Sequence, residues 1–430
     1  MLKWSSIILL WIGISANQSQ ILAQSQIKVS NLKKHIRFLA DDKLKGRAPG
    51  SEGDILAENY IINCFEQYNL LPYGDKMDKI VKKGDKIIRN AYTQAFSFSL
   101  SNNPHGSADD PNAPKENGRN IVGFLDNGAT NTIVIGAHYD HLGDTGRGSS
   151  LDANPEGKIH NGADDNASGV AGLLELARIY STNNIKEQHN FLFIAFSAEE
   201  AGLIGSKYYV NNPTVPLEKM QAMFNMDMVG RLNDSTQKLM VYGVGTSPIF
   251  VPMLSNFNHK PFQLSTDSSG VGPSDHTSFY LKNVPVLHFF TGQHADYHKP
   301  TDDYSKINFK GEAKVLTFMT QLIDLIDASP KLSFRETKVK AAKSNGFKVS
   351  MGVMPDYAFD GKGLRVDGVT EGKPAQKAGL KAGDIVLKLG ETDVTNIYDY
   401  MDALNHFEKG VTTQVQVLRN KKVETFTITF

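Results

Sequence analysis

The chain of 430 residues is long enough for two or three domains, and its 40% hydrophobic and 21% charged residues are typical of a globular protein. Lysine and arginine total 46, as do aspartate and glutamate, so no net field favours nucleic acid or an anionic membrane as a partner. The single cysteine, Cys64, excludes an intramolecular disulfide.

Residues 1–23 have the pattern of a secretory signal peptide, because Lys3 precedes the apolar run Ile7–Ile14 and small residues follow. That run is too short to span a bilayer. The alternative is a hydrophobic N-terminal helix that anchors in the membrane. A secreted chain without disulfides fits a bacterial periplasm or exterior best. We therefore expect a secreted or periplasmic protein whose mature chain has no integral membrane segment.

Apolar residues at helical spacing predict helices at 31–41 and 51–69, with a glycine-rich loop at 46–50 between them. Residues 72–118 are polar and predict an irregular or weakly stranded insert. From residue 121 onward strands and helices alternate, with strands at 121–125, 132–136, 191–196, 220–226, 239–244 and 286–290 and helices at 167–180, 206–210, 247–257 and 309–326. This alternation predicts an α/β fold with a mostly parallel central sheet and helices on both faces.

The strand over Phe191–Phe196 is the most apolar of these, and two adjacent carboxylates, Glu199 and Glu200, follow it closely. In open α/β sheets the ligand crevice lies beyond the carboxyl ends of the strands. In hydrolytic metal sites one carboxylate binds the metal and its neighbour acts as general base. The alternative for an isolated Glu-Glu pair is an exposed acidic loop.

Other strand ends also carry metal-ligating residue types. His138 follows the strand at 132–136, Asp227 follows 220–226, and His298 is reached through the loop after 286–290. A glycine-bounded loop containing Asp164 precedes the helix at 167–180. Imidazole and carboxylate are the ligands that zinc takes where no thiolate is available. Each residue alone has an ordinary structural explanation, but their joint arrival at one sheet edge predicts two ions held by about five ligands, one of them shared.

Five motifs together resemble the co-catalytic di-zinc aminopeptidases, a family that includes aminopeptidase Y, secreted bacterial leucyl aminopeptidases, glutamate carboxypeptidase II and, as a one-zinc relative, glutaminyl cyclase. They are HYDH at 138–141, GADDNASG at 162–169, SAEE at 197–200, NMDMVG at 225–230 and YHKPTDD at 297–303. The resemblance covers about residues 30–328 and implies the αβα sandwich of zinc peptidases.

By position, the resemblance implies the ligands of two zinc ions: His138 and Asp227 for one, Glu200 and His298 for the other, and Asp164 as the bridge. It also implies a cis peptide bond between Asp164 and Asp165, and it predicts that Asp164→Asn loses metal. Cobalt or manganese fits the same ligands.

The same resemblance implies the catalytic roles. Glu199 is the general base that takes a proton from a metal-bridged water, Asp140 orients His138, and Tyr297 donates to the developing oxyanion. The expected activity is that of an aminopeptidase on peptides with free N-termini. The alternatives are a one-zinc glutaminyl cyclase acting on N-terminal glutamine and a catalytically silent peptide-binding scaffold.

Four further segments receive structural interpretations. His288 lies within a strand and is expected in the core. His141 and His294 are near the predicted site but match no ligand position of the family. Ser274-Asp275-His276 is interpreted as a supporting or pocket-wall segment, because adjacent residues do not readily converge as a hydrolase triad.

Composition divides the chain into a signal peptide at 1–23, a peptidase domain at 24–328, a linker at 329–345 and a β-rich domain at 346–430. The last segment resembles a PDZ domain through PAQKAGLKAGD at 374–384. The resemblance implies a groove beside Met351–Pro355 that takes a C-terminal peptide as an added strand. The alternative is a module that only packs against the catalytic domain.

Overall fold

The computed structural model describes residues 26–81, 85–99, 115–152, 154–256, 260–337, 349–355, 361–369, 372–395 and 397–430. The predicted signal peptide at 1–23 and residues 338–345 of the predicted linker lie outside the described residues. Within the described ranges, no helix is both long enough and apolar enough to cross a membrane.

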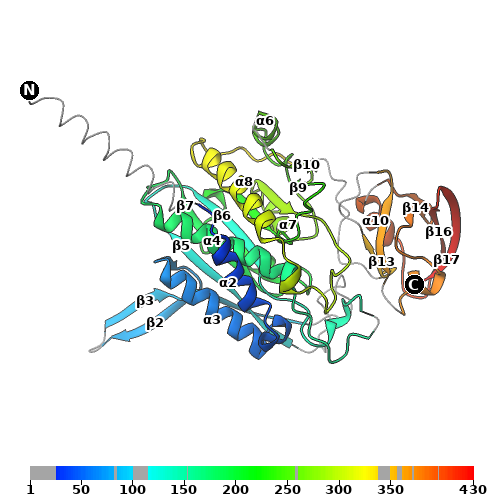
Figure 1. Ribbon diagram of the computed structural model, residues 1–430, viewed down its shortest axis with the longest axis horizontal. Helices are drawn as coiled ribbons and strands as arrows, with labels where there is room; N and C mark the ends of the chain where they lie inside the picture. Colours follow the sequence, from blue (N-terminus) through cyan, green and yellow to red (C-terminus); the bar gives the residue numbers. More distant parts are fainter. Residues whose placement is uncertain are drawn as a thin grey trace, which may run out of the picture.

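A nine-stranded sheet forms the centre of the first domain (Figure 1). Its four central strands run parallel, in the order β7 (Asn190–Phe196), β6 (Thr132–His138), β8 (Met220–Met226) and β11 (Val286–Phe290). The flanking strands are antiparallel to these neighbours, with β5 (Lys115–Leu125) beside β7 and β9 (Lys238–Tyr242) beside β11. The outermost strands are β1 (Leu71–Pro72), β4 (Thr93–Ser99) and β10 (Gln263–Thr266). The sheet is thus parallel at its centre and mixed at its edges.

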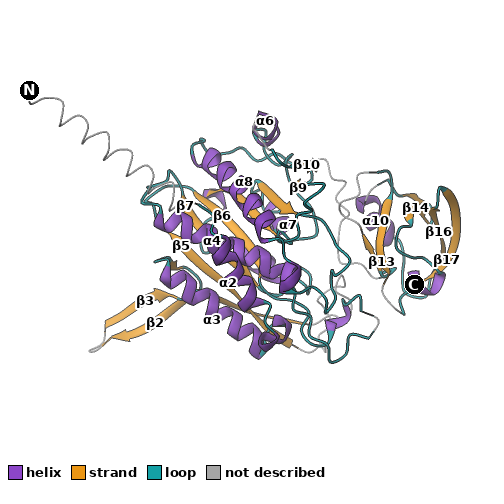
Figure 2. Ribbon diagram, viewed as in Figure 1, coloured by secondary structure: helices purple, strands orange, loops and turns teal. Residues whose placement is uncertain are grey.

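Side chains of the central strands alternate between two apolar clusters, because successive residues of a strand point to opposite faces. Ile133 and Ile135 of β6 pack in the larger cluster, whereas Val134 packs in the smaller one. The larger cluster is completed by α2 (Val29–Leu39), α3 (Glu52–Gln67), α4 (Gly169–Thr182) and α8 (Phe309–Asp327), and the smaller one by α5 (Ile204–Asn211) and α7 (His276–Tyr280). Helices therefore cover both faces of the sheet, as predicted (Figure 2).

The segment at 72–118 is more regular than predicted. It contains the hairpin of β2 (Lys76–Val81) and β3 (Asp85–Asn90), then β4, and β5 begins at Lys115 rather than at 121. On β4 only Gln94, Phe96 and Phe98 are buried. A strand at a sheet edge needs few apolar residues, so its sequence signal is weak.

Helix α6 (Phe250–Asn256) lies within the predicted helix at 247–257. The short helix α7 and the strand β10 were not predicted. Helix α7 has five residues, which is too few to establish a helical repeat, and no residue of β10 is buried.

The second domain is β-rich. Its strands β12 (Val353–Pro355), β13 (Leu364–Val369), β14 (Ile385–Leu389), β15 (Thr392–Asp393), β16 (Thr412–Arg419) and β17 (Lys422–Thr429) form one antiparallel sheet, with helices α9 (Pro374–Ala378) and α10 (Ile397–Leu404). Val366, Val386 and Val415 are fully buried at its core. Asp384, the last residue of the PAQKAGLKAGD motif, accepts a hydrogen bond of 2.6 Å from Nε of Arg419.

Candidate metal centre

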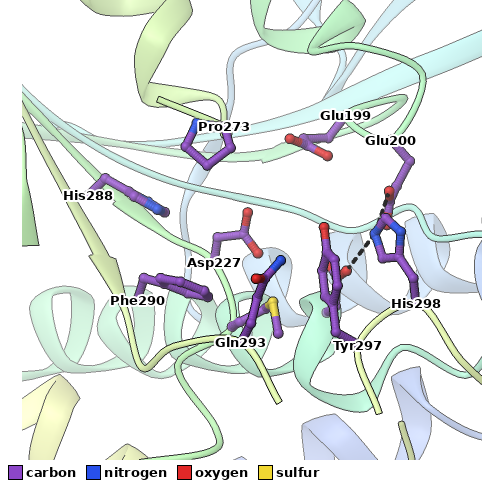
Figure 3. A pocket seen from close by; sticks show the side chains of 11 residues that line it. Glu199, Glu200, Asp227, Pro273, His288, Phe290, Gln293, Tyr297 and His298 are labelled. Carbon is purple, nitrogen blue, oxygen red and sulfur yellow. Dashed lines mark ion pairs between the residues drawn. The ribbon is translucent and has the colours of Figure 1, made fainter. Parts of the chain in front are cut away.

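The carboxyl ends of the parallel strands bring the predicted site residues to one edge of the sheet. Strand β6 ends at His138, Glu199 and Glu200 follow β7, and Asp227 follows β8. His298 arrives from the loop after β11. In Figure 3 the side chains of Glu199, Glu200, Asp227 and His298 surround one pocket.

Two groups of ligand-type atoms share the carboxylate of Asp165. In the first, Nε2 of His138 lies 3.4 Å from Oδ1 of Asp165 and 3.4 Å from Oδ1 of Asp227. In the second, Nε2 of His298 lies 3.3 Å from Oδ2 of Asp165 and 3.2 Å from Oε2 of Glu200. Each group has two carboxylate oxygens and one imidazole nitrogen, and the two oxygens of Asp165 belong to different groups.

The position between the two groups therefore belongs to Asp165, which corrects the assignment of that position to Asp164. Oδ1 of Asp164 instead accepts hydrogen bonds from Oγ of Ser168 at 2.9 Å and from the backbone N–H of Gly230 at 2.7 Å. Its Oδ2 lies 3.1 Å from Nε2 of His294. The cis peptide bond is likewise one residue further along than predicted, between Asp165 and Asn166.

The spacing of these atoms fits bound metal ions better than it fits hydrogen bonds. Donor atoms held about 2.0–2.1 Å from a tetrahedral ion lie roughly 3.3–3.4 Å from one another. The four separations above, 3.2–3.4 Å, match that value. Oδ1 of Asp227 and Nε2 of His298 are buried and have no hydrogen-bond partner of standard geometry among the described residues. Buried polar atoms rarely remain unpaired, so the residues present fit a pair of cations.

The buried carboxylates of the cluster also favour a positive charge beside them. Burial alone lowers the pKa of His298, yet Glu200 and Asp165 raise it well above the usual histidine value. The pKa of His138 is raised in the same way by Asp227 and Glu199 against the effect of burial. Both imidazoles thus lie where the surrounding carboxylates strongly favour a cation.

Asp140 lies between His138 and the backbone of Glu199. Its Oδ1 accepts a hydrogen bond from the N–H of Glu199 at 3.0 Å and lies 3.7 Å from Nδ1 of His138. The backbone carbonyl of Asp140 is closer to that nitrogen, at 3.2 Å. The hydrogen-bond contact of Nδ1 of His138 is therefore with the main-chain carbonyl of Asp140, whereas the carboxylate, to which the resemblance assigns the orienting role, lies at ion-pair distance.

Glu199 has a different environment from Glu200. Burial raises the pKa of Glu199 well above its usual value, and the nearby carboxyl groups of Asp275 and Asp227 add to this effect. By contrast, His298 and His141 hold the pKa of Glu200 well below its usual value despite burial. The carboxylate of Glu199 is thus the more basic of the two adjacent glutamates, and that of Glu200 is the less basic.

The remaining pocket wall is largely apolar. Tyr297 lies beside His298 with ring centroids 3.9 Å apart, and Phe290 and Pro273 also line the pocket (Figure 3). Met228 is a further lining residue. His288 is buried, as expected, but its ring borders the pocket. Tyr297 thus lines the same pocket as Glu199 and His298.

The sequence did not single out Arg47, a fully buried residue of the loop at 46–50. Its guanidinium donates to the carbonyl of Tyr139 at 2.7 Å, to those of Asn161 and Gly162 at 2.7 and 3.1 Å, and to that of Leu39. Arg47 thereby ties the segment after β6 to the loop that carries Asp165. A charged residue in a short Gly-Arg-Ala-Pro-Gly loop was the available signal.

Asp302, in the YHKPTDD motif, was also given no role. Its Oδ2 accepts hydrogen bonds from the backbone N–H groups of Asp164 and Asp165 at 2.9 and 3.0 Å. These two bonds fix the direction in which the loop presents its two aspartates.

Comparisons with known proteins agree with the fold and with the division into a peptidase domain and a PDZ domain. Residues 120–323 match peptidase family M28, and residues 335–430 match the PDZ domain. Leupeptin-inactivating enzyme 1 of Streptomyces exfoliatus is 33% identical over 186 residues, which are 42% of this chain and 37% of that protein. Aminopeptidase YwaD of Bacillus subtilis is 27% identical over 223 residues, 49% of this chain and 45% of that protein. The chain thus spans less than half the length of these curated relatives.

Solved structures share the fold at low sequence identity. LapA aminopeptidase of Legionella pneumophila has a TM-score of 0.52 at 18% identity, covering 73% of this chain and 75% of that one. Glutaminyl cyclase of Bacteroides thetaiotaomicron has a TM-score of 0.51 at 19% identity, covering 71% of this chain and 99% of that one. At this level both similarities describe the architecture alone.

Proposed function

The chain contains a peptidase domain of family M28 followed by a PDZ domain, and from this premise we propose that it is a secreted zinc aminopeptidase that works with two metal ions. The observation that carries the proposal is the carboxylate of Asp165, whose two oxygens lie 3.4 and 3.3 Å from the imidazoles of His138 and His298. A carboxylate shared in this way is what a pair of ions requires.

The ligand sets follow from the two groups of atoms. His138 and Asp227 would hold one zinc, Glu200 and His298 would hold the other, and Asp165 would bridge them. Only three protein ligands per ion leaves each site open, as catalytic zinc sites are. When bound, the ions would supply Lewis-acid polarisation of the scissile carbonyl and acidify the attacking water.

The protein's own groups carry the proton transfers. Glu199 lies at the pocket with a raised pKa, so it is suited to take a proton from the attacking water and to return it to the leaving amine. The phenol of Tyr297 lines the same pocket and is suited to donate to the oxyanion that develops on the carbonyl. Asp140 positions Glu199 and His138 and takes no direct part.

The substrate class is a peptide with a free N-terminus. Several relatives are named aminopeptidases, and the apolar wall that includes Phe290 and Met228 supports binding of an apolar N-terminal side chain. The pattern of residues 1–23 supports secretion. A C-terminal peptide in the PDZ groove would add beside β12, whose one partner strand among the described residues is β13.

Mass spectrometry on zinc-loaded protein tests the activity with a mixture of peptides that have free, acetylated or glutamine N-termini. Stepwise loss of residues from free N-termini only is the expected result, and Glu199→Gln protein prepared in parallel should leave every peptide intact. Loss of ammonia from glutamine peptides alone would instead identify a glutaminyl cyclase. Cleavage inside acetylated peptides, or loss from their C-termini, would refute the aminopeptidase assignment.

A further inference from the structure

The HYDH motif ends in His141, a histidine that matches no ligand position of the family. Its side chain is fully buried, and its Nδ1 lies 2.7 Å from Oε1 of Glu200. The same nitrogen lies 3.9 Å from Oδ2 of Asp165. His141 is therefore close enough to Asp165 and Glu200 either to bind a metal ion itself or to form a hydrogen bond with a residue that does.

The distances distinguish these roles. Two ligands of one tetrahedral zinc lie about 3.3–3.4 Å apart, whereas a charge-assisted N–H···O hydrogen bond spans about 2.7–2.9 Å. The 2.7 Å contact between His141 and Glu200 is thus a hydrogen bond, and it engages Oε1, whereas Oε2 faces His298 at 3.2 Å. We propose that His141 is a positioning residue that holds one oxygen of Glu200 so that the other binds the second metal ion. This inference rests on the proposed function.

The surroundings of His141 fix its ring in the required orientation. A Cβ on Gly162 would lie 2.5 Å from Cδ2 of His141, so the loop that carries Asp165 packs directly on the imidazole. The backbone N–H of His141 donates to the carbonyl of Arg47 at 3.3 Å. The loop that carries Asp165 therefore packs on the ring, and the loop of the buried arginine holds the backbone of His141.

The second nitrogen of the ring makes no contact that competes with Glu200. Nε2 of His141 is buried and has no hydrogen-bond partner among the described residues. The ring therefore meets the ligand cluster through Nδ1 alone, which accords with the rule that carboxylate ligands are themselves hydrogen-bonded.

The test compares two nearly isosteric replacements, His141→Asn and His141→Leu. The amide of asparagine places an N–H donor near the position of Nδ1, whereas leucine fills similar space without one. Zinc content and zinc affinity are measured by titration against a chromophoric chelator, with thermal melting to verify folding. A control variant, His189→Leu, removes another buried histidine whose Nδ1 lies 3.1 Å from a carboxylate, that of Asp327, outside the site.

Wild-type protein and His189→Leu should each bind two zinc ions. His141→Leu should weaken one of the two sites by about 10- to 100-fold and leave the other unchanged, and His141→Asn should recover most of that loss. Unchanged affinity of both sites in His141→Leu would overturn the inference. An equal loss in His141→Asn and His141→Leu would overturn it as well, because it would identify the imidazole as a direct ligand. Fewer than two zinc ions on the wild type would refute the two-metal function itself.

Discussion

Replacing the two adjacent aspartates one at a time separates the bridging role from the supporting role. The structure predicts that Asp165→Asn loses metal and that Asp164→Asn keeps it, which reverses the expectation from the sequence. Oδ1 and Oδ2 of Asp165 face different imidazoles. Asparagine keeps only one side-chain oxygen, so in Asp165→Asn one of the two groups of ligand atoms loses an oxygen. Both groups lose the negative charge of the shared carboxylate.

The magnitudes follow from the contacts of each side chain. Loss of a partner outside the ligand set typically lowers metal affinity about 10- to 100-fold, so loss of a shared ligand should exceed this at one site at least. In Asp164→Asn the amide oxygen still accepts from Ser168 and Gly230, and only the contact with His294 changes character. That change should cost about 1–3 kcal/mol of stability and leave metal affinity within a few-fold of wild type.

Elemental analysis after gel filtration gives the zinc content of both variants, and urea unfolding gives their stability. The reasoning is refuted if Asp164→Asn emerges folded but free of zinc while Asp165→Asn retains two ions. Equal zinc content in both variants would also contradict it, because only the carboxylate of Asp165 faces the imidazoles of His138 and His298.

Three further predictions concern residues around this pair. Glu199→Gln should keep both zinc ions and lower kcat by about 10²- to 10⁴-fold, measured by turnover and elemental analysis, and intact turnover would exclude Glu199 as the base. Arg47→Met should lower the free energy of unfolding by at least about 3 kcal/mol in urea, because the four carbonyls that Arg47 binds would lose their donor. Burial raises the pKa of Asp54 to about 7, so stability should fall as pH rises from about 4 to 7, by up to roughly 1.4 kcal/mol per unit. Asp54→Asn should remove that part of the dependence of unfolding free energy on pH. Equal pH dependence in both proteins would show that the pKa of Asp54 is not raised.

The strands that carry the site were predictable because they are continuous apolar runs. The predicted strands at 220–226 and 286–290 coincide with β8 and β11, and 191–196 lies within β7. All residues of these three strands are buried. Burial on both faces removes the alternation of polar residues, so the run itself marks the strand. Once the strand ends were located, the arrival of His138, the Glu199-Glu200 pair and Asp227 at one sheet edge followed from the geometry of a parallel sheet. The choice of Glu200 as the ligand rested on the resemblance to the di-zinc aminopeptidases.

The choice between Asp164 and Asp165 was not predictable from local sequence. The two residues are adjacent in a loop without a hydrophobic repeat, so nothing local distinguishes their directions. Distant partners decide it: Asp302 accepts from both backbone N–H groups, and the N–H of Gly230 binds the side chain of Asp164. The hairpin of β2 and β3 was expected only as part of an irregular or weakly stranded insert. Among the described strands these two pair with each other, and their sequences lack the regular apolar alternation that marks a strand.

The hydrogen bonds of Arg47 indicate whether the loops of the site become ordered when the domain folds or only when metal binds. In small zinc-dependent domains the metal must order the chain, and much of its binding free energy is consumed by folding. Here one buried guanidinium already joins the segments of Tyr139, Asn161 and Leu39. The loops that supply His138 and Asp165 are therefore organised when the domain folds, before any ion arrives. Apoprotein should then remain cooperative and native-like, and metal binding should proceed as a rigid, preorganised association whose affinity is not reduced by the ordering of loops.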